Sequence, residues 1–450
     1  MRGLRSTLAL FVVLVGLGAY IYFVTWKRPD AGDTASKQEK VFTSLEADKI
    51  EELKIKAEKG DTTTVVKKDG AWQVTAPIGT AADESEVSSI TSGLAQLNVV
   101  RVVDDNPADL KEYGLATPRV QIDFKASGDK DYRRLLVGDK SPTGSDIFAQ
   151  RNDEKRIFLI PAYQDTTFNK DTFNLREKKL LRFDRDKVDR VELAAAGKDV
   201  ALAKEGTEWK LAAPVQVRAD FGAVEGLLGR LQTAQMKSIA ADGAQPADLK
   251  KYGLDKPEVT VNVNAGSARA TLMVGGKAED GSVYVRDASR PMVMTAESSF
   301  ADDLKKGADE YRRKDIFEFR AYNANRVELT RNAQTIVFEK TKGEGENPQD
   351  KWRRVSPNAA DADKDKIDSL LSRLSNMRAT SFVDGAARTG LDKPELAVYV
   401  KFDDGKKEER VSFGKVGEDA FASRPSEPGA AKVDATDVTE ALKTLDEISK

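Results

Sequence analysis

Three related stretches decide the fold of this chain: AWQVTAP at residues 71–77, EWKLAAP at 208–214 and KWRRVSP at 351–357. Each alternates in the manner of a strand and closes on a proline. Each also carries a tryptophan, and these are Trp72, Trp209 and Trp352. The two intervals between them are nearly equal at about 140 residues, the size of an autonomous domain rather than of a solenoid unit. Their equivalence indicates a structural core role; stacking on a sugar or peptide is the alternative.

A helix is predicted after each of these strands. Apolar residues recur there with the i, i+3, i+4, i+7 spacing of one buried helix face. They are Val87, Ile90 and Leu94, then Val224, Leu227, Leu228 and Leu231, then Ile367, Leu370, Leu371 and Leu374. An aspartate precedes each set, at a position where a helix N-terminus favours a short acceptor side chain. These aspartates are Asp83, Asp220 and Asp363.

A second set of landmarks follows the helices: YGLATPRVQIDF at 113–124, YGLDKPEVTVNV at 252–263 and TGLDKPELAVYV at 389–400. The glycines predict helix ends or turns, and the prolines predict the start of a strand. The glycines are Gly114, Gly253 and Gly390, and the prolines are Pro118, Pro257 and Pro394. A further strand with a glycine comes next in every copy: LLVGDK at 135–140, LMVGGK at 272–277 and VSFGKV at 411–416.

These landmarks recur in one order, so the chain is predicted to hold three tandem copies of a single α+β domain. Within a copy we expect three strands, a helix, a short helix, four strands and a final helix. Short polar turns between neighbouring strands predict a mainly antiparallel sheet with helices packed on one face. The joints lack Gly/Ser-rich spacers, which predicts a semi-rigid row. The predicted copies are residues 41–182, 183–318 and 319–450.

The N-terminal segment is apolar and uncharged over LALFVVLVGLGAYIYFVTW at residues 8–26. Its length is close to the roughly 20 residues of a membrane-spanning helix, and Tyr20, Tyr22 and Trp26 lie where an aromatic belt is expected. We predict one transmembrane helix, with residues 1–7 in the cytoplasm, a linker at 27–40, and the three copies outside the cytoplasm. A cleaved signal peptide and the reverse orientation are the alternatives.

Composition excludes several kinds of chemistry. The chain contains no cysteine and no histidine. Disulfides, thiolate or His-ligated zinc sites, and catalysis by Ser-His-Asp or Cys-His groups are therefore excluded. Lys and Arg total 72 against 74 Asp and Glu, and this near neutrality without a long basic run argues against nucleic acid as a partner. We expect no cofactor and no metal, and predict that the protein is not an enzyme.

Two local motifs resemble ligand sites but have simpler interpretations. A D-x-D-x-D run at 361–365 suggests a calcium loop, yet Lys366 and Ser372 stand where such a loop needs Gly and Glu. Helix capping by Asp363 is the prediction there, and calcium is the alternative. The run VGDKS at 137–141 suggests a phosphate-binding loop, but Asp139 interrupts the required G-K-[ST]. We predict a strand-ending turn for it.

Basic residues gather in the joints between copies, LREKKLLRF at 175–183 and YRRKDIFEF at 311–319. Salt bridging between copies, or solvation, is one interpretation of these clusters. Docking of an acidic partner or of anionic lipid headgroups is the other. The residues concerned are Arg176, Lys178, Arg312 and Lys314.

The W-x-(V/L)-x-x-P strand, the Y-G-L-x-x-P turn and the V-G strand, after an N-terminal anchor, together resemble the bacterial family catalogued as domain of unknown function 4340. The resemblance covers essentially residues 41–450, and Thr389 departs from the tyrosine of the other copies. It implies a membrane-anchored, extracytoplasmic protein whose relatives are often encoded beside ABC-type transporter components of the gliding-motility kind. It implies no catalytic residues.

We therefore expect a non-catalytic binding or scaffold protein in the bacterial inner membrane, with its C-terminal bulk in the periplasm. By resemblance, its partner is a protein of an ABC-type transporter or gliding-motility-like envelope complex. Three copies multiply the available surface and allow avidity. One alternative is a stand-alone periplasmic module that binds a ligand or the cell wall. Another is a hydrolase that uses carboxylates alone, although no acidic pair stands out in the sequence.

Overall fold

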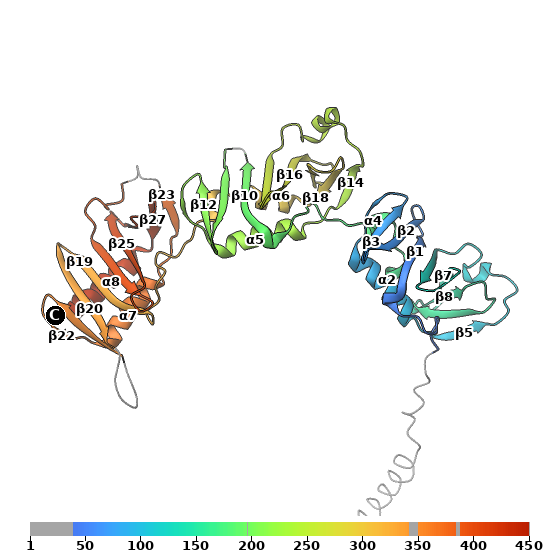
Figure 1. Ribbon diagram of the computed structural model, residues 1–450, viewed down its shortest axis with the longest axis horizontal. Coiled ribbons are helices and arrows are strands. Elements are labelled where there is room, and N and C mark those ends of the chain that lie inside the picture. The colour runs from blue at the N-terminus through green and yellow to red at the C-terminus, as the bar shows by residue number, and fades with distance from the viewer. Residues whose placement is uncertain (1–38, 196, 342–349, 384–387, 450) are drawn as a thin grey trace, which may run out of the picture. The chain divides into compact units, whose positions relative to one another are not determined.

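Each predicted copy forms its own nine-stranded sheet in the computed structural model (Figure 1). The structure describes residues 39–195, 197–341, 350–383 and 388–449. Within these ranges all the strand pairings between named strands are antiparallel. The prediction of three tandem antiparallel α+β copies is confirmed.

The predicted transmembrane helix at residues 8–26 lies outside the described residues, as do residues 1–7 and most of the linker. Across the described ranges, no helix combines the length and the apolar character that a bilayer crossing requires.

Among the described residues, the first copy contains nine strands and three α-helices. The strands are β1 (Ile50–Lys56), β2 (Thr63–Lys68), β3 (Ala71–Ala76), β4 (Thr80–Ala81), β5 (Arg101–Asp104), β6 (Val120–Ala126), β7 (Arg133–Lys140), β8 (Asp146–Arg151) and β9 (Ile157–Pro161). The helices are α2 (Glu84–Gln96), α3 (Gln164–Phe168) and α4 (Thr172–Leu175). The sheet order is β4-β3-β2-β1-β6-β7-β8-β9-β5.

The second and third copies repeat this order. The second contains β10 (Val188–Ala195), β11 (Val200–Glu205), β12 (Glu208–Ala213), β13 (Val217–Arg218), α5 (Phe221–Thr233), β14 (Ser238–Ala241), β15 (Val259–Ala265), β16 (Ala268–Lys277), β17 (Val283–Asp287), β18 (Val293–Ala296) and α6 (Ser298–Leu304). The third contains β19 (Ala324–Arg331), β20 (Gln334–Thr341), β21 (Lys351–Ser356), β22 (Ala360–Asp361), α7 (Lys364–Ser375), β23 (Ser381–Val383), β24 (Leu396–Phe402), β25 (Lys407–Val416), β26 (Asp419–Ser423), β27 (Ala430–Val433) and α8 (Ala435–Ser449).

Two strands in each copy were not expected from the sequence. They are the short strands before and after the first long helix, such as β4 and β5, and they form the two edges of the sheet. Two to four residues are too few to show an alternation of apolar and polar side chains. The helix that joins them, α2 in the first copy, has to cross the sheet from one edge to the other, and it covers the apolar face on its way (Figure 1).

The core of each copy lies between that helix and one face of its sheet. The central strand of each sheet alternates strictly between buried and half-buried residues in β6, β15 and β24. The buried face of α2 is the predicted one, with Val87, Ile90 and Leu94 fully enclosed. Equivalent residues of α5 and α7 are also buried. The last helix differs between copies, since α3 and α4 are short whereas α8 has 15 residues.

The chain divides into two compact units, residues 1–178 and 179–450, of which the first holds one copy and the second holds two. At residues 177–180 the chain passes directly from hydrogen bonds with one sheet to hydrogen bonds with the next. Glu177 N–H donates to Ala81 O in the first copy, and Leu180 N–H donates to Ala234 O in the second. The first copy therefore ends about four residues before the predicted boundary at 182, because half of the basic joint belongs to each sheet.

Candidate functional site

The three tryptophans lie in the third strand of each copy and are all buried. In two copies the indole donates to a carboxylate on the helix that crosses the sheet. Trp209 Nε1 donates to Glu225 at 3.2 Å, and Trp352 Nε1 donates to Asp368 at 3.0 Å. These tryptophans therefore tie the third strand to the helix. Burial of Trp72 in β3 places it in the equivalent core position.

The Y-G-L-x-x-P landmarks form a tight turn ahead of the strand at the centre of each sheet. Gly114, Gly253 and Gly390 have φ values of 66°, 67° and 69°, in the left-handed region that glycine adopts most readily. The prolines stand two residues before β6, β15 and β24, so the predicted strand starts are confirmed. They are Pro118, Pro257 and Pro394.

A second glycine in each copy lies against this turn. A Cβ placed there would lie 2.1 Å from Tyr113 O at Gly138, 2.2 Å from Tyr252 O at Gly275, and 2.4 Å from Thr389 O at Gly414. No side chain fits at those distances. The Y-G-L and V-G motifs are therefore the two halves of one backbone packing contact, which we call the glycine contact. Because Gly138 lies within β7, the VGDKS run is the end of a strand, as predicted.

The predicted helix caps are confirmed. Oxygens of Asp83, Asp220 and Asp363 accept backbone N–H groups in the first turn of α2, α5 and α7. The D-x-D-x-D run is thus a capping site followed by the helix. Among the described residues, no group of three or more acidic side chains is arranged to hold a metal ion.

The basic joint residues lie in packed surroundings. Arg176 and Arg312 are buried, and the Arg312 guanidinium carbon lies 3.7 Å from the centre of the Phe382 ring. Lys178 Nζ pairs with Asp83 at 3.2 Å. Lys314 is half-buried, and its carbonyl accepts the Ala379 N–H at 2.7 Å. Docking of these residues on an acidic partner or on lipid stays a prediction.

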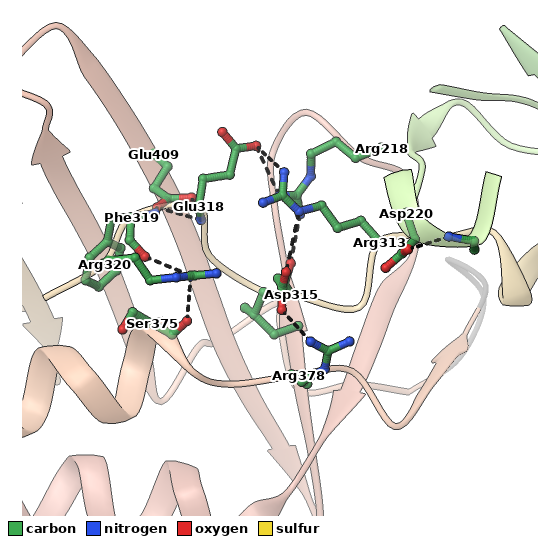
Figure 2. Close-up of polar contacts among 12 residues, drawn as sticks. Arg218, Asp220, Arg313, Asp315, Glu318, Phe319, Arg320, Ser375, Arg378 and Glu409 are labelled. Atoms are coloured by element: carbon green, nitrogen blue, oxygen red, sulfur yellow. Dashed lines mark hydrogen bonds and ion pairs between the residues drawn. The ribbon is translucent and has the colours of Figure 1, made fainter. Parts of the chain in front are cut away.

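Within residues 179–450, a network of charged side chains joins the second and third copies (Figure 2). It centres on Arg218 in β13, whose guanidinium pairs with Glu318 at 3.2 Å and with Glu427 at 2.5 Å. The same guanidinium donates to Asp315 O at 3.3 Å. Asp315 in turn pairs with Arg378 at 2.9 Å. We call this set the junction network.

Three arginine side chains surround the carboxylate of Glu318 in that network. Its carboxylate lies 3.2 Å from Arg218, 3.7 Å from Arg313 and 3.9 Å from Arg424. Burial raises the pKa of the Glu318 carboxyl, but the three guanidinium charges outweigh burial and hold that pKa below its ordinary value. The network therefore keeps Glu318 ionised, and it acts as a structural ion-pair cluster.

A recess of about 320 Å³ opens beside the network. Trp209, Arg218 and Arg313 line it together with Phe221, the first residue of α5. Phe221 is 62% exposed. The first and third copies carry charged residues, Glu84 and Lys364, at this position, so the exposed aromatic ring is particular to the second copy. An exposed aromatic ring at the mouth of a recess is a candidate contact for a ligand or partner.

A feature missed by the sequence analysis holds the incoming segment of every copy. Arg151 donates to Val41 O at 2.7 Å in the first copy, and Arg424 donates to Ile316 O at 2.9 Å in the third. In the second copy Arg290 donates to the carbonyls of Lys179 and Leu180. We call this repeated interaction the arginine clamp. It fixes the segment through which each copy joins the chain before it.

The carboxylate that balances the clamp differs between copies. Arg151 pairs with Glu154 three residues later, whereas Arg290 pairs with Asp287 three residues earlier. Asp287 occupies the strand position of Arg151, since both lie two residues beyond the partner of the valine before the V-G glycine. Arg424 instead uses Glu409, and Glu427 is left to pair with Arg218. An R-x-x-E spacing aligns in the first and third copies, but the second copy reverses it to D-x-x-R, so no motif common to all three copies marks the clamp.

Comparison with known proteins identifies one protein family. The family model described as Domain of unknown function (DUF4340) matches residues 72–210, 209–383 and 352–450. No curated protein matches the chain. Two solved structures of the DNA polymerase sliding clamp from Pseudomonas aeruginosa, one of them with ligand, align at 9% identity. The alignments cover 88% and 87% of this chain and 93% and 92% of those chains, with TM-scores of 0.15 and 0.16. Similarity this low establishes neither fold nor function.

Proposed function

Because this chain belongs to the family described as Domain of unknown function (DUF4340), we propose that it is a non-catalytic scaffold of the bacterial envelope. The scaffold is anchored in the inner membrane by the uncharged stretch at residues 8–26 and displays three domains outside the cytoplasm. Its partner is a membrane protein complex, of the ABC-type transporter or gliding-motility kind that the family resemblance implies.

One observation carries this proposal: the landmarks common to the copies serve packing. The repeated tryptophans are buried, the repeated glycines hold a backbone contact, and the repeated aspartates cap helices. Repetition therefore multiplies a folded surface rather than a reactive group. Such multiplication increases avidity when several copies engage one partner.

Gentle detergent extraction of the full chain, followed by quantitative mass spectrometry, tests the scaffold role. We expect one membrane complex to be recovered in constant ratio to the chain, above the level found with an unrelated single-pass protein. Protease added outside the inner membrane should degrade the three copies. Recovery at the control level, or protection of the C-terminal copies from the protease, would refute the proposal.

The recess beside Phe221 favours a second candidate, a module that binds an envelope polymer without a membrane partner. Aromatic side chains at a recess contribute much of the contact area in such sites. The full chain should then sediment with purified cell-wall polymer, and Phe221→Glu, which introduces the residue type of the first copy, should abolish the effect. Unchanged sedimentation of this variant would argue against it.

A further inference from the structure

The short strand before the first long helix (β4, β13 or β22) forms one edge of each sheet, which we call the outer edge. In the first copy, the segment that follows helix α4 covers this edge. Glu177 N–H donates to Ala81 O at 2.9 Å, and Asp83 N–H donates to Leu175 O at 2.8 Å. Lys178 adds an ion pair to Asp83 at 3.2 Å. An extended basic segment thus pairs with β4 as a short added strand.

The second copy repeats this arrangement in the same register. Arg313 N–H donates to Arg218 O at 3.0 Å, and Asp220 N–H donates to Tyr311 O at 2.8 Å. The covering segment is again basic, with the sequence YRRK at 311–314. Two independent copies therefore show what this edge accepts and which backbone groups hold it.

Among the described residues, nothing covers the outer edge of the third copy in this way. Helix α8 continues to Ser449, whereas α4 and α6 end at Leu175 and Leu304, ahead of the extended segments of the other copies. The equivalent groups are Asp361 O and Asp363 N–H, and no backbone group of the described residues hydrogen-bonds to either of them. Burial reports the same difference: Ala82 and Ala219 are 5% and 7% exposed, whereas Ala362 is only half-buried.

The uncovered edge is also the most acidic of the three. The third copy carries Asp361, Asp363 and Asp365 where the first has Ala81, Asp83 and Ser85, and the second has Arg218, Asp220 and Gly222. Both Asp361 and Asp363 are exposed, and none of the three acids has an ion-pair partner among the described residues. Exposed strand edges pair readily with extended chains, and charge complementarity selects among them.

We propose that the β22 edge binds an extended basic segment of a partner protein by strand addition. The guest places a basic residue opposite Ala362, donates the next N–H to Asp361 O, and receives the Asp363 N–H. Leu175 and Tyr311 are buried in the other two copies, and in the third copy Ile448 of α8 already packs against the core, so the guest needs no apolar anchor. This inference rests on the proposed scaffold function and names the chemistry of its partner.

The test uses the full chain in detergent and a fluorescent peptide with the sequence of residues 174–179, NLREKK. Fluorescence anisotropy should show saturable binding. Asp361→Arg should weaken it at least about tenfold, since it reverses the charge at the edge. This variant is expected to fold because the second copy carries Arg218 at the same position. The matched charge reversal Glu418→Arg, in the exposed turn between β25 and β26, should leave binding unchanged.

Backbone methylation of the peptide separates strand addition from simple charge attraction. Methylation of the nitrogen equivalent to Glu177 N removes the donor to Asp361 O and should weaken binding at least about tenfold. Methylation one residue earlier should have little effect, because Arg176 N–H makes no bond to the edge in the first copy: it donates to Thr172 O, a residue that the peptide lacks. Equal binding of the two methylated peptides, or no binding of the unmethylated one, would overturn the proposal.

The remaining outcomes distinguish the occupant from the function. If the full chain self-associates and Asp361→Arg disperses it, the occupant is a second copy of this chain and the proposed partner is wrong. If wild type and Asp361→Arg recover the same membrane complex equally, the edge proposal fails while the scaffold function stands. If neither recovers a complex, the scaffold function fails and the peptide measurements still decide the edge.

Discussion

The glycine contact uses glycine at the same place in all three copies, whereas the arginine clamp is constructed differently in each. Both interactions join parts of a copy that are distant in sequence. At the glycine contact, a main-chain carbonyl lies so close to Gly138, Gly275 or Gly414 that only glycine fits. At the clamp, a guanidinium reaches a carbonyl from two different positions: from the end of a strand in the first and third copies, and from the turn that follows the strand in the second.

The difference teaches which interactions constrain a sequence. Close approach of two backbones leaves one permitted residue type, so the glycine persists. A guanidinium on a long flexible stem reaches the same carbonyl from several positions, and it requires only that a carboxylate balances it. The copies can therefore exchange charges at the clamp, as Arg151–Glu154 and Asp287–Arg290 do, while the fold stays the same.

The largest effect is expected at the glycine contact. Gly275→Ala forces a Cβ to 2.2 Å from Tyr252 O and should destabilise the second copy by about 3 kcal/mol. Gly276→Ala is the matched control, because its Cβ would lie 3.7 Å from the same oxygen and the other copies carry Asp139 and Lys415 there. Hydrogen exchange of β15 and β16 measures both variants. Equal protection in the two would show that the contact is not what fixes glycine.

The next largest effect is expected where the clamp is buried. The Glu409 side chain is 2% exposed, pairs with Arg424 at 2.8 Å and accepts the N–H groups of Glu318 and Phe319. Glu409→Ala removes the closest carboxylate of the Arg424 guanidinium, which keeps only Glu318 at 3.9 Å, and should cost about 2–3 kcal/mol. Hydrogen exchange of β24 and β25 in the full chain measures the loss.

The control for that variant is the same truncation in the first copy. Glu154 is 41% exposed and pairs with Arg151 at the surface, so Glu154→Ala should cost less than about 1 kcal/mol. Similar losses in the two copies would contradict the view that burial, rather than the pair itself, sets the energy of the clamp.

The third prediction exchanges the charges of the second copy. Arg290→Glu places a carboxylate beside Asp287 and the carbonyls of Lys179 and Leu180, and should cost about 2–3 kcal/mol. Adding Asp287→Arg recreates the order found in the first copy and should recover at least about half of that loss. A double-mutant cycle by urea unfolding measures the recovery. Strictly additive losses would show that the two orders are not interchangeable.

The sequence was sufficient for the features that the copies share. Trp209 and Asp220 recur at fixed spacing, and their periodicity and capping roles have direct physical meanings, so core strand, helix and cap followed from them. Gly253 was recognised as a turn, but its partner Gly275 was seen only as part of a strand. The contact between them joins segments about 20 residues apart, and neither periodicity nor spacing specifies it.

The features that differ between copies were beyond sequence reasoning. Arg151 and Arg424 share a position that Asp287 holds in the second copy, so comparison of the three copies conceals the clamp. Arg312 was read as one of a basic cluster, although a buried guanidinium stacked on Phe382 depends on how two sheets meet. The acidic run at 361–365 resembles a calcium motif in the sequence, whereas its place at the edge of a sheet follows only from the fold.

The smallest effect is expected at the junction network, through the ionisation of Glu318. Three guanidiniums outweigh its burial and lower the pKa of this carboxyl in the folded state. The stabilisation is therefore complete above the pKa of the unfolded chain, about 4.3, and is lost as the pH falls through the folded value. Because Glu318 is partly exposed, the loss should be at most about 1 kcal/mol and should shrink as salt is added.

Urea unfolding of the full chain between about pH 6 and pH 3 tests this, with Glu318→Gln beside the wild type. The variant should be less stable than the wild type at pH 6, and the difference should vanish toward pH 3. Glu418→Gln, in an exposed turn away from the network, controls for the loss of one acid. A difference that persists unchanged at low pH would mean that Glu318 stabilises the junction through packing. The sequence could then replace the Glu318 charge without loss of stability, as it rearranges the charges at the clamp.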